Sequence, residues 1–209
     1  MSWPTDPGRA ATVRGRAAIL IGVALLASGC ARRAPTGAGL HPLYGLAPRL
    51  AFTLQDAASG AAVTAATFRD RVVMLYFGYT HCPDVCPTTL AKLAAAVREL
   101  APAERHRVRI LFVTVDPARD TLAVLRPYAA AFGPEVVGLR GTKAQIDRLA
   151  ERYRVTYSFG KPDARGNYDV THSSAVFIFG PQGRSAAVVE PADGVPAIRA
   201  TLRTLVHPT

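Results

Sequence analysis

The sequence predicts an α/β sandwich, in which helices and strands alternate along the chain and pack as layers around one core. Two nearly continuous apolar runs, residues 72–77 and 108–115, have the length and composition of strands buried on both faces. Segments with helical spacing of apolar residues follow both runs, and short strands with a closing helix complete the chain. With 209 residues, of which 49% are hydrophobic, the chain suits one domain plus appendages.

The first 29 residues have the pattern of an export signal. A positively charged flank precedes an apolar run at 17–27, which is shorter than the roughly 20 residues that span a bilayer. Small residues before Cys30 resemble a bacterial lipoprotein cleavage site, which would leave Cys30 as the lipidated first residue of the mature chain. An ordinary signal, cleaved or uncleaved, and an incidental apolar segment are the alternatives. We therefore expect a protein exported to the bacterial cell envelope and anchored to the membrane, with its domain on the periplasmic side.

The cysteine count and the net charge limit the kinds of site and binding partner that the sequence predicts. The chain has three cysteines, so lipidation of Cys30 would leave Cys82 and Cys86 as one pair outside the reducing cytosol. The formal net charge of +10 is compatible with acidic partners or an anionic membrane surface. The basic residues are scattered and mostly Arg, however, which indicates compositional bias. No Lys/Arg run with interleaved aromatic residues predicts nucleic-acid binding.

Residues 30–48 are rich in Pro and Gly, which predicts a flexible tether before a domain at 49–209. The domain is expected to open with an additional N-terminal β-hairpin, with strands at 52–54 and 61–63. After the strand at 72–77, the pattern predicts helices that begin at Pro87, at Asp120 or Thr121, at Thr142 and at Ala197, and strands at 108–115, 136–137, 168–170, 175–179 and 186–189.

Cys82 and Cys86 lie between the predicted strand at 72–77 and the helix that follows it. Residues four positions apart share one helix face, and the N-terminal end of a helix favours a negatively charged thiolate. Three interpretations remain open: a structural disulfide, a redox dithiol, or a metal site. A metal site requires further ligands, because two thiolates rarely complete a coordination shell.

The five histidines differ as candidate ligands. His41, His106 and His207 occupy positions typical of solvated surface, and His81 is expected to point away from its neighbour Cys82. His172 lies in the turn between two predicted strands, and such loops can converge with a strand-to-helix loop at one end of an α/β sheet. By spacing alone, an isolated histidine is more often structural than a ligand.

Three ordered segments resemble the motif set of the Sco/SenC family: residues 77–87 (FGYTHCPDVCP), 115–121 (VDPARDT) and 168–173 (YDVTHS). The resemblance implies a thioredoxin-like fold that binds one copper ion per chain, as Cu(I), Cu(II) or both. The implied ligands are Cys82, Cys86 and His172. Two soft thiolates and an imidazole agree with that implication, because this donor set suits Cu(I) and, with a further weak donor, Cu(II).

The resemblance implies a membrane-tethered copper chaperone that matures the dinuclear copper site of cytochrome c oxidase. Its partners would be the copper-bearing oxidase subunit or another copper enzyme, and other copper chaperones. The alternative is a thiol-disulfide oxidoreductase that reduces client cysteines, which would be the one enzymatic activity expected. Three residues separate the cysteines, instead of the two typical of thioredoxin, and no Pro occurs at 172–174. A peroxidase of the peroxiredoxin type would require a Pro ahead of Thr80, and this chain has none at 76–79. A copper or redox sensor is a further possibility.

Asp116 follows the strand at 108–115 and corresponds to the Asp-Pro segment of the family. It is expected either to tune the metal site or contact a partner, or simply to close the strand-to-helix loop before Pro117. Two positions depart from the pattern: Thr171 replaces a frequent Asp immediately before the histidine, and Gly180 also replaces a frequent Asp. Both changes bear on partner docking and on tuning of the histidine.

Overall fold

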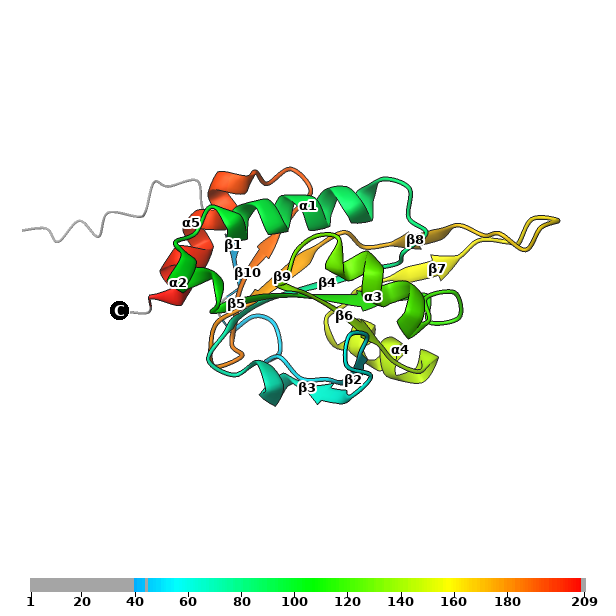
Figure 1. The fold of residues 1–209 in the computed structure, drawn as a ribbon, viewed down its shortest axis with the longest axis horizontal. Helices are drawn as coiled ribbons and strands as arrows, with labels where there is room; N and C mark the ends of the chain where they lie inside the picture. The colour runs from blue at the N-terminus through cyan, green and yellow to red at the C-terminus, as the bar shows by residue number, and fades with distance from the viewer. Residues whose placement is uncertain (1–39, 44, 208–209) are drawn as a thin grey trace, which may run out of the picture. The chain divides into compact units, whose positions relative to one another are not determined.

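The computed structural model describes residues 40–43 and 45–207. Its main feature is an eight-stranded mixed sheet with the strand order β1-β10-β9-β4-β5-β6-β2-β3, accompanied by a separate two-stranded sheet, β7-β8 (Figure 1). The strands are β1 (His41–Pro42), β2 (Thr53–Asp56), β3 (Ala62–Thr64), β4 (Val72–Gly78), β5 (Val108–Thr114), β6 (Val136–Arg140), β7 (Tyr157–Phe159), β8 (Val170–His172), β9 (Val176–Phe179) and β10 (Ser185–Val189). The helices are α1 (Val85–Arg98), α2 (Pro102–Arg105), α3 (Leu122–Ala130), α4 (Lys143–Arg152) and α5 (Val195–Val206), with a 3₁₀ turn at Ala65–Phe68.

The centre of the sheet consists of three parallel strands, β4, β5 and β6. Every residue of β4 is buried, as its continuous apolar sequence predicts for a strand covered on both faces. β9 pairs with the other edge of β4 in antiparallel orientation, and the β2–β3 hairpin extends the β6 edge. The predicted α/β architecture with an N-terminal hairpin is therefore confirmed.

Helices cover both faces of the sheet. α3 packs over β6, where a side chain at Gly138 would meet Leu125 at 2.8 Å. α1 covers the same face and also packs against α5. On the opposite face Tyr153, at the end of α4, packs against Phe177 and Phe179 of β9. The two sequence-predicted caps form, since the side chains of Thr121 and Thr142 accept backbone hydrogen bonds at the starts of α3 and α4.

Several features differ from the sequence-based expectation. α1 begins at Val85 instead of Pro87, α5 begins at Val195 instead of Ala197, and α2 was not expected. β8 spans Val170–His172 instead of 168–170, so His172 ends a strand and does not lie in a turn. β1 lies within the segment expected to be a tether and pairs with β10, so hydrogen bonding to a sheet edge orders residues that lack hydrophobic periodicity. β7 was not expected, because it is short and only its first residue is partly buried. The predicted signal segment and Cys30 lie outside the described residues.

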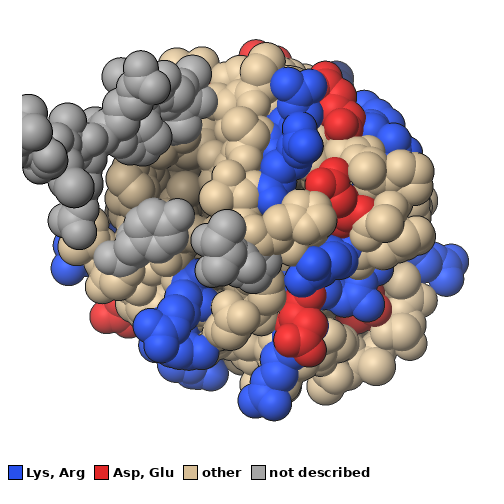
Figure 2. Space-filling model, turned by 90° about the vertical axis from the view of Figure 1, so that its left-hand side faces the viewer, with Lys and Arg blue, Asp and Glu red and all other residues tan. Residues whose placement is uncertain are grey.

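Charge is mixed on the end of the molecule where α2 and α5 lie. Figure 2 shows Lys and Arg side chains interspersed with Asp and Glu on this face. Arg199 of α5 pairs with Glu99 at 2.8 Å, and His207 lies 2.8 Å from Glu104 of α2. Some basic side chains at this end of the molecule therefore have acidic neighbours.

Candidate metal centre

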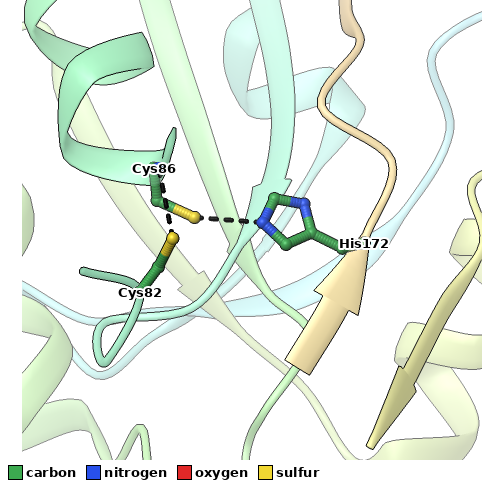
Figure 3. Close-up of side chains that lie close together, drawn as sticks. All are labelled: Cys82, Cys86 and His172. Carbon is green, nitrogen blue, oxygen red and sulfur yellow. Dashed lines mark hydrogen bonds between the residues drawn. The ribbon is translucent and has the colours of Figure 1, made fainter. Parts of the chain in front are cut away.

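Three potential metal ligands from distant parts of the chain converge beside the start of α1 (Figure 3). Cys82 lies in the turn before α1, Cys86 in its first turn, and His172 at the end of β8. Their ligand atoms lie within 4.8 Å of one another, and Cys86 Sγ is 3.1 Å from His172 Nε2. Within the described part of the chain, no other group of three His, Cys, Asp or Glu side chains converges in this way.

The orientation of His172 leaves one ring nitrogen for the two sulfurs. Its Nδ1 is 3.0 Å from the Ser173 carbonyl oxygen, which can only accept, so Nδ1 carries the proton and Nε2 has a free lone pair. Burial lowers the pKa of His172, which keeps the imidazole neutral near pH 7. The ring contacts the rings of Tyr76 and Tyr79 edge-on, with centroids 6.1 and 5.9 Å away.

The two thiols occupy different environments. Cys86 is fully buried, and burial raises the pKa of its thiol to about 12. Cys82 is partly exposed. Burial opposes its ionisation, but the backbone N–H groups of Cys86 and Asp84 face its sulfur, and the pKa of Cys82 is lowered. The Cys86 N–H donates to Cys82 Sγ at 3.3 Å, so this sulfur occupies the place of a helix cap for α1. The cysteines are free and not joined as a disulfide.

The turn that carries Cys82 is fixed by a buried carboxylate, that of Asp120. The Thr80 backbone N–H donates to it at 2.9 Å, and the Thr80 and Thr114 hydroxyls donate at 2.6 Å each. His81 also faces Asp120, with Nδ1 3.6 Å from its carboxylate, and lies outside the three-ligand group. The sequence indicated Asp120 only as a helix cap; its place inside the 115–121 motif was the available signal.

Asp116 is nearly completely buried and lies outside the three-ligand group. It forms an ion pair with Arg119 and accepts a hydrogen bond from the Tyr168 hydroxyl at 2.9 Å. Arg119 in turn donates to the Tyr168 carbonyl at 2.9 Å and stacks 3.7 Å above the Tyr168 ring. These contacts attach the segment before β8, and hence the strand that ends in His172, to the end of β5.

The remaining histidines lie elsewhere. His41 is exposed on β1, His106 follows α2, and His207 follows α5. None of them belongs to the converging group.

The model of one family, SCO1/SenC, matches residues 47–207, which is most of the chain. The chain belongs to the SCO1/SenC family. Among curated relatives, the mitochondrial SCO2 homolog of Bos taurus is 46% identical over 119 residues, which cover 56% of this chain and 45% of the relative. The chain thus spans about half the length of the curated relatives it matches.

Two solved structures resemble the fold closely. The structure of Bradyrhizobium japonicum ScoI with copper bound has a TM-score of 0.69 and 31% identity, and the match covers 76% of this chain and 99% of that one. Yeast Sco1 with copper bound gives a TM-score of 0.67 and 30% identity, covering 76% and 89%. The predicted thioredoxin-like fold of this family is confirmed.

The prediction of a bacterial cell-envelope location is wrong, because the curated relatives from cattle, human and yeast are mitochondrial proteins. A basic flank before a short apolar run does not identify the compartment, since mitochondrial targeting segments are also rich in Arg and poor in acidic residues. None of the helices at 40–43 and 45–207 has the length and apolar composition needed to cross a membrane.

Proposed function

We propose that the protein is a copper chaperone that binds one copper ion through Cys82, Cys86 and His172 and delivers it to the dinuclear copper site of cytochrome c oxidase. The observation that carries the proposal is the convergence of the three ligand atoms within 4.8 Å. Membership of the SCO1/SenC family and the copper-bound state of two similar solved structures support it.

The donor set suits copper as a cargo. Two thiolates and an imidazole form a soft three-coordinate environment that favours Cu(I). Binding replaces the thiol protons, which pass to solvent. Cys86 lies deeper than Cys82, whose sulfur is partly exposed. An acceptor thiolate can therefore approach the metal from the Cys82 side and exchange with that ligand first.

Anaerobic Cu(I) titration against a chromophoric chelator tests the proposal. We expect the wild-type protein to bind one Cu(I) tightly, and the variants Cys82→Ser, Cys86→Ser and His172→Ala to lose that site. His106→Ala is the matched control, because His106 lies outside the converging group. Undiminished binding in the ligand variants would refute the proposal.

Delivery is tested by mixing the copper-loaded protein with the copper-free soluble domain of the oxidase subunit. We expect two equivalents of the Cu(I)-loaded protein to fill the site, and the absorbance spectrum of a dinuclear copper centre to appear once an added oxidant such as ferricyanide has removed one electron. The His172→Ala variant should not produce that spectrum.

A second candidate function, reduction of client disulfides, is favoured by the pairing of a partly exposed Cys82 with a buried Cys86. The Cys82 thiolate would attack one sulfur of the client disulfide, and Cys86 would then displace the client from the mixed disulfide. Two electrons pass from this dithiol to the client, leaving a Cys82–Cys86 disulfide. His172→Ala separates the functions, because a reductase retains turnover in this variant whereas a chaperone loses its copper.

A further inference from the structure

Two buried hydroxyl groups near the metal centre have no hydrogen-bond partner. Among the described residues, the buried side-chain polar atoms without a partner include the hydroxyls of Tyr76 and Tyr128. Tyr76 is completely buried in β4. Nearly all buried polar groups in proteins are hydrogen-bonded, so an unpaired hydroxyl beside a binding site calls for an explanation.

The Tyr76 side chain lies on the same face of the sheet as the Cys86 sulfur. Side chains alternate along a strand, so Tyr76 and Gly78 face the same side of β4. A Cβ atom at Gly78 would lie 2.9 Å from Cys86 Sγ, so this sulfur packs directly against that face. The Tyr76 ring also contacts the His172 ring edge-on, with centroids 6.1 Å apart. Tyr76 therefore adjoins two of the three ligands.

The chemistry of Cys86 changes when copper binds. In the metal-free protein its sulfur faces His172 Nε2 at 3.1 Å, as a thiol that donates to the imidazole. A thiol sulfur is a weak acceptor, so a hydrogen bond from a nearby hydroxyl to a thiol contributes little free energy. Copper takes the place of the thiol proton and leaves a charged sulfur in a fully buried position. A buried charge requires hydrogen-bond donors, and bonds to charged groups are the stronger ones.

We propose that the Tyr76 hydroxyl donates a hydrogen bond to the Cys86 sulfur when copper is bound, which makes Tyr76 a positioning residue for the metal. The inference rests on the proposed copper-binding function. The neighbourhood agrees with it: burial raises the pKa of the Cys86 thiol to about 12, and the Tyr76 hydroxyl acts on this thiol in the opposite direction, in favour of the thiolate.

Tyr76→Phe removes the hydroxyl and keeps the ring, and Tyr128→Phe is the matched control. The Tyr128 hydroxyl is also buried and unpaired, and Tyr128 lies on the same side of the sheet, packed against Phe112. Its ring packs against Phe112 and Phe132, and its hydroxyl forms no hydrogen bond with the Cys86 thiol. Only Tyr76→Phe therefore removes a hydroxyl that is proposed to contact the Cys86 sulfur.

We expect Tyr76→Phe to lower the Cu(I) affinity about tenfold or more, the loss typical of a hydrogen bond to a charged group. The metal-free variant should unfold at the same urea concentration as the wild type or a higher one, because the Tyr76 hydroxyl of the wild type has no hydrogen-bond partner that the substitution could remove. In the Cu(II)-loaded protein, the sulfur-to-copper charge-transfer band should move to longer wavelength. Tyr128→Phe should retain the wild-type affinity and the wild-type band.

Other outcomes overturn the inference. Wild-type copper affinity in Tyr76→Phe would show that the hydroxyl does not contact the metal-bound sulfur. A destabilised metal-free variant with unchanged affinity would assign the hydroxyl to Thr89, its other neighbour. An equal loss of Cu(I) affinity in Tyr128→Phe would show that the effect does not depend on contact between the Tyr76 hydroxyl and the Cys86 sulfur. Failure of the proposed function is distinct, since the wild-type protein itself would then bind no copper or the cysteine variants would bind it equally well.

Discussion

The two regions that supply the ligands are anchored in different ways. The turn at 79–86 rests on the buried carboxylate of Asp120 and packs its second cysteine against the bare backbone of Gly78. The β7–β8 hairpin, which carries His172, forms a sheet of its own and reaches out beyond the main sheet (Figure 1). Its Phe159 is 41% exposed. The turn that carries the sulfurs is thus anchored in the core of the domain, whereas the imidazole belongs to a peripheral element.

The comparison indicates unequal local stability. A two-stranded hairpin is marginal by itself, and stability varies across a folded domain with buried contacts. The hairpin is attached mainly through Arg119, which stacks on Tyr168, and through Tyr157 of β7, whose hydroxyl donates to Asp147 of α4. A bound metal would join the rigid region to the weaker one and stabilise the hairpin most.

The largest effect is expected for the turn, from Asp120→Ala. The variant leaves three donors without their acceptor, one buried at Thr114 and two part-buried at Thr80, which costs about 3 kcal/mol of unfolding free energy. Urea unfolding measures the loss. Asp163→Ala is the matched control in the hairpin, because Asp163 also accepts three hydrogen bonds, from Arg165 and Asn167, but is exposed. Equal losses in the two variants would contradict the unequal anchoring of turn and hairpin.

A smaller effect is expected for the hairpin, from Arg119→Lys. Lysine keeps the charge beside Asp116 but loses the planar stack on Tyr168 and the fixed pair of hydrogen bonds, which amounts to about 1 kcal/mol. Amide hydrogen exchange should accelerate in β7 and β8 and remain unchanged in α1. Arg126→Lys is the control, since Arg126 is exposed on α3. Acceleration throughout the domain would show that the hairpin is not a separate unit.

The smallest effect is expected for the pH dependence of stability, through His172. Burial lowers the pKa of His172 below its ordinary value of 6.5, so the unfolded chain takes up a proton at a pH where the folded protein does not. The contribution of His172 to stability is therefore constant above about pH 6.5 and falls as the pH decreases towards the lowered pKa. Urea unfolding of the wild type and of His172→Gln between about pH 8 and 5 isolates it. A stability advantage of the wild type over His172→Gln that grows as the pH falls would contradict the assignment.

Sequence patterns predicted the elements with strong local signals. Continuous apolar runs located β4 and β5, and Thr121 and Thr142 capped helices as expected, because these features depend on neighbouring residues alone. β7 escaped prediction because a short, mostly exposed strand has no hydrophobic alternation. Its pairing with β8 provides the order that its own sequence does not.

The site was only partly predictable. Spacing indicated a reactive cysteine pair, but a single histidine 86 residues away is indistinguishable from a structural one, and the family resemblance was needed to select His172. The roles of Asp120 and Arg119 depend on which loops meet at the ends of β4 and β5. Such contacts are formed by the tertiary fold and leave no periodic trace in the sequence.

The position of β9 determines the order in which the three ligands come together during synthesis and folding. β9 follows His172 closely and must insert between β4 and β10, so the third ligand arrives with the strand that completes the sheet. Pairings between distant strands form late in folding, whereas the helix that carries Cys86 forms from local contacts. On the ribosome, both thiols emerge long before the imidazole. We expect a nascent chain to offer copper an incomplete site, and full affinity to develop only once the sheet has closed.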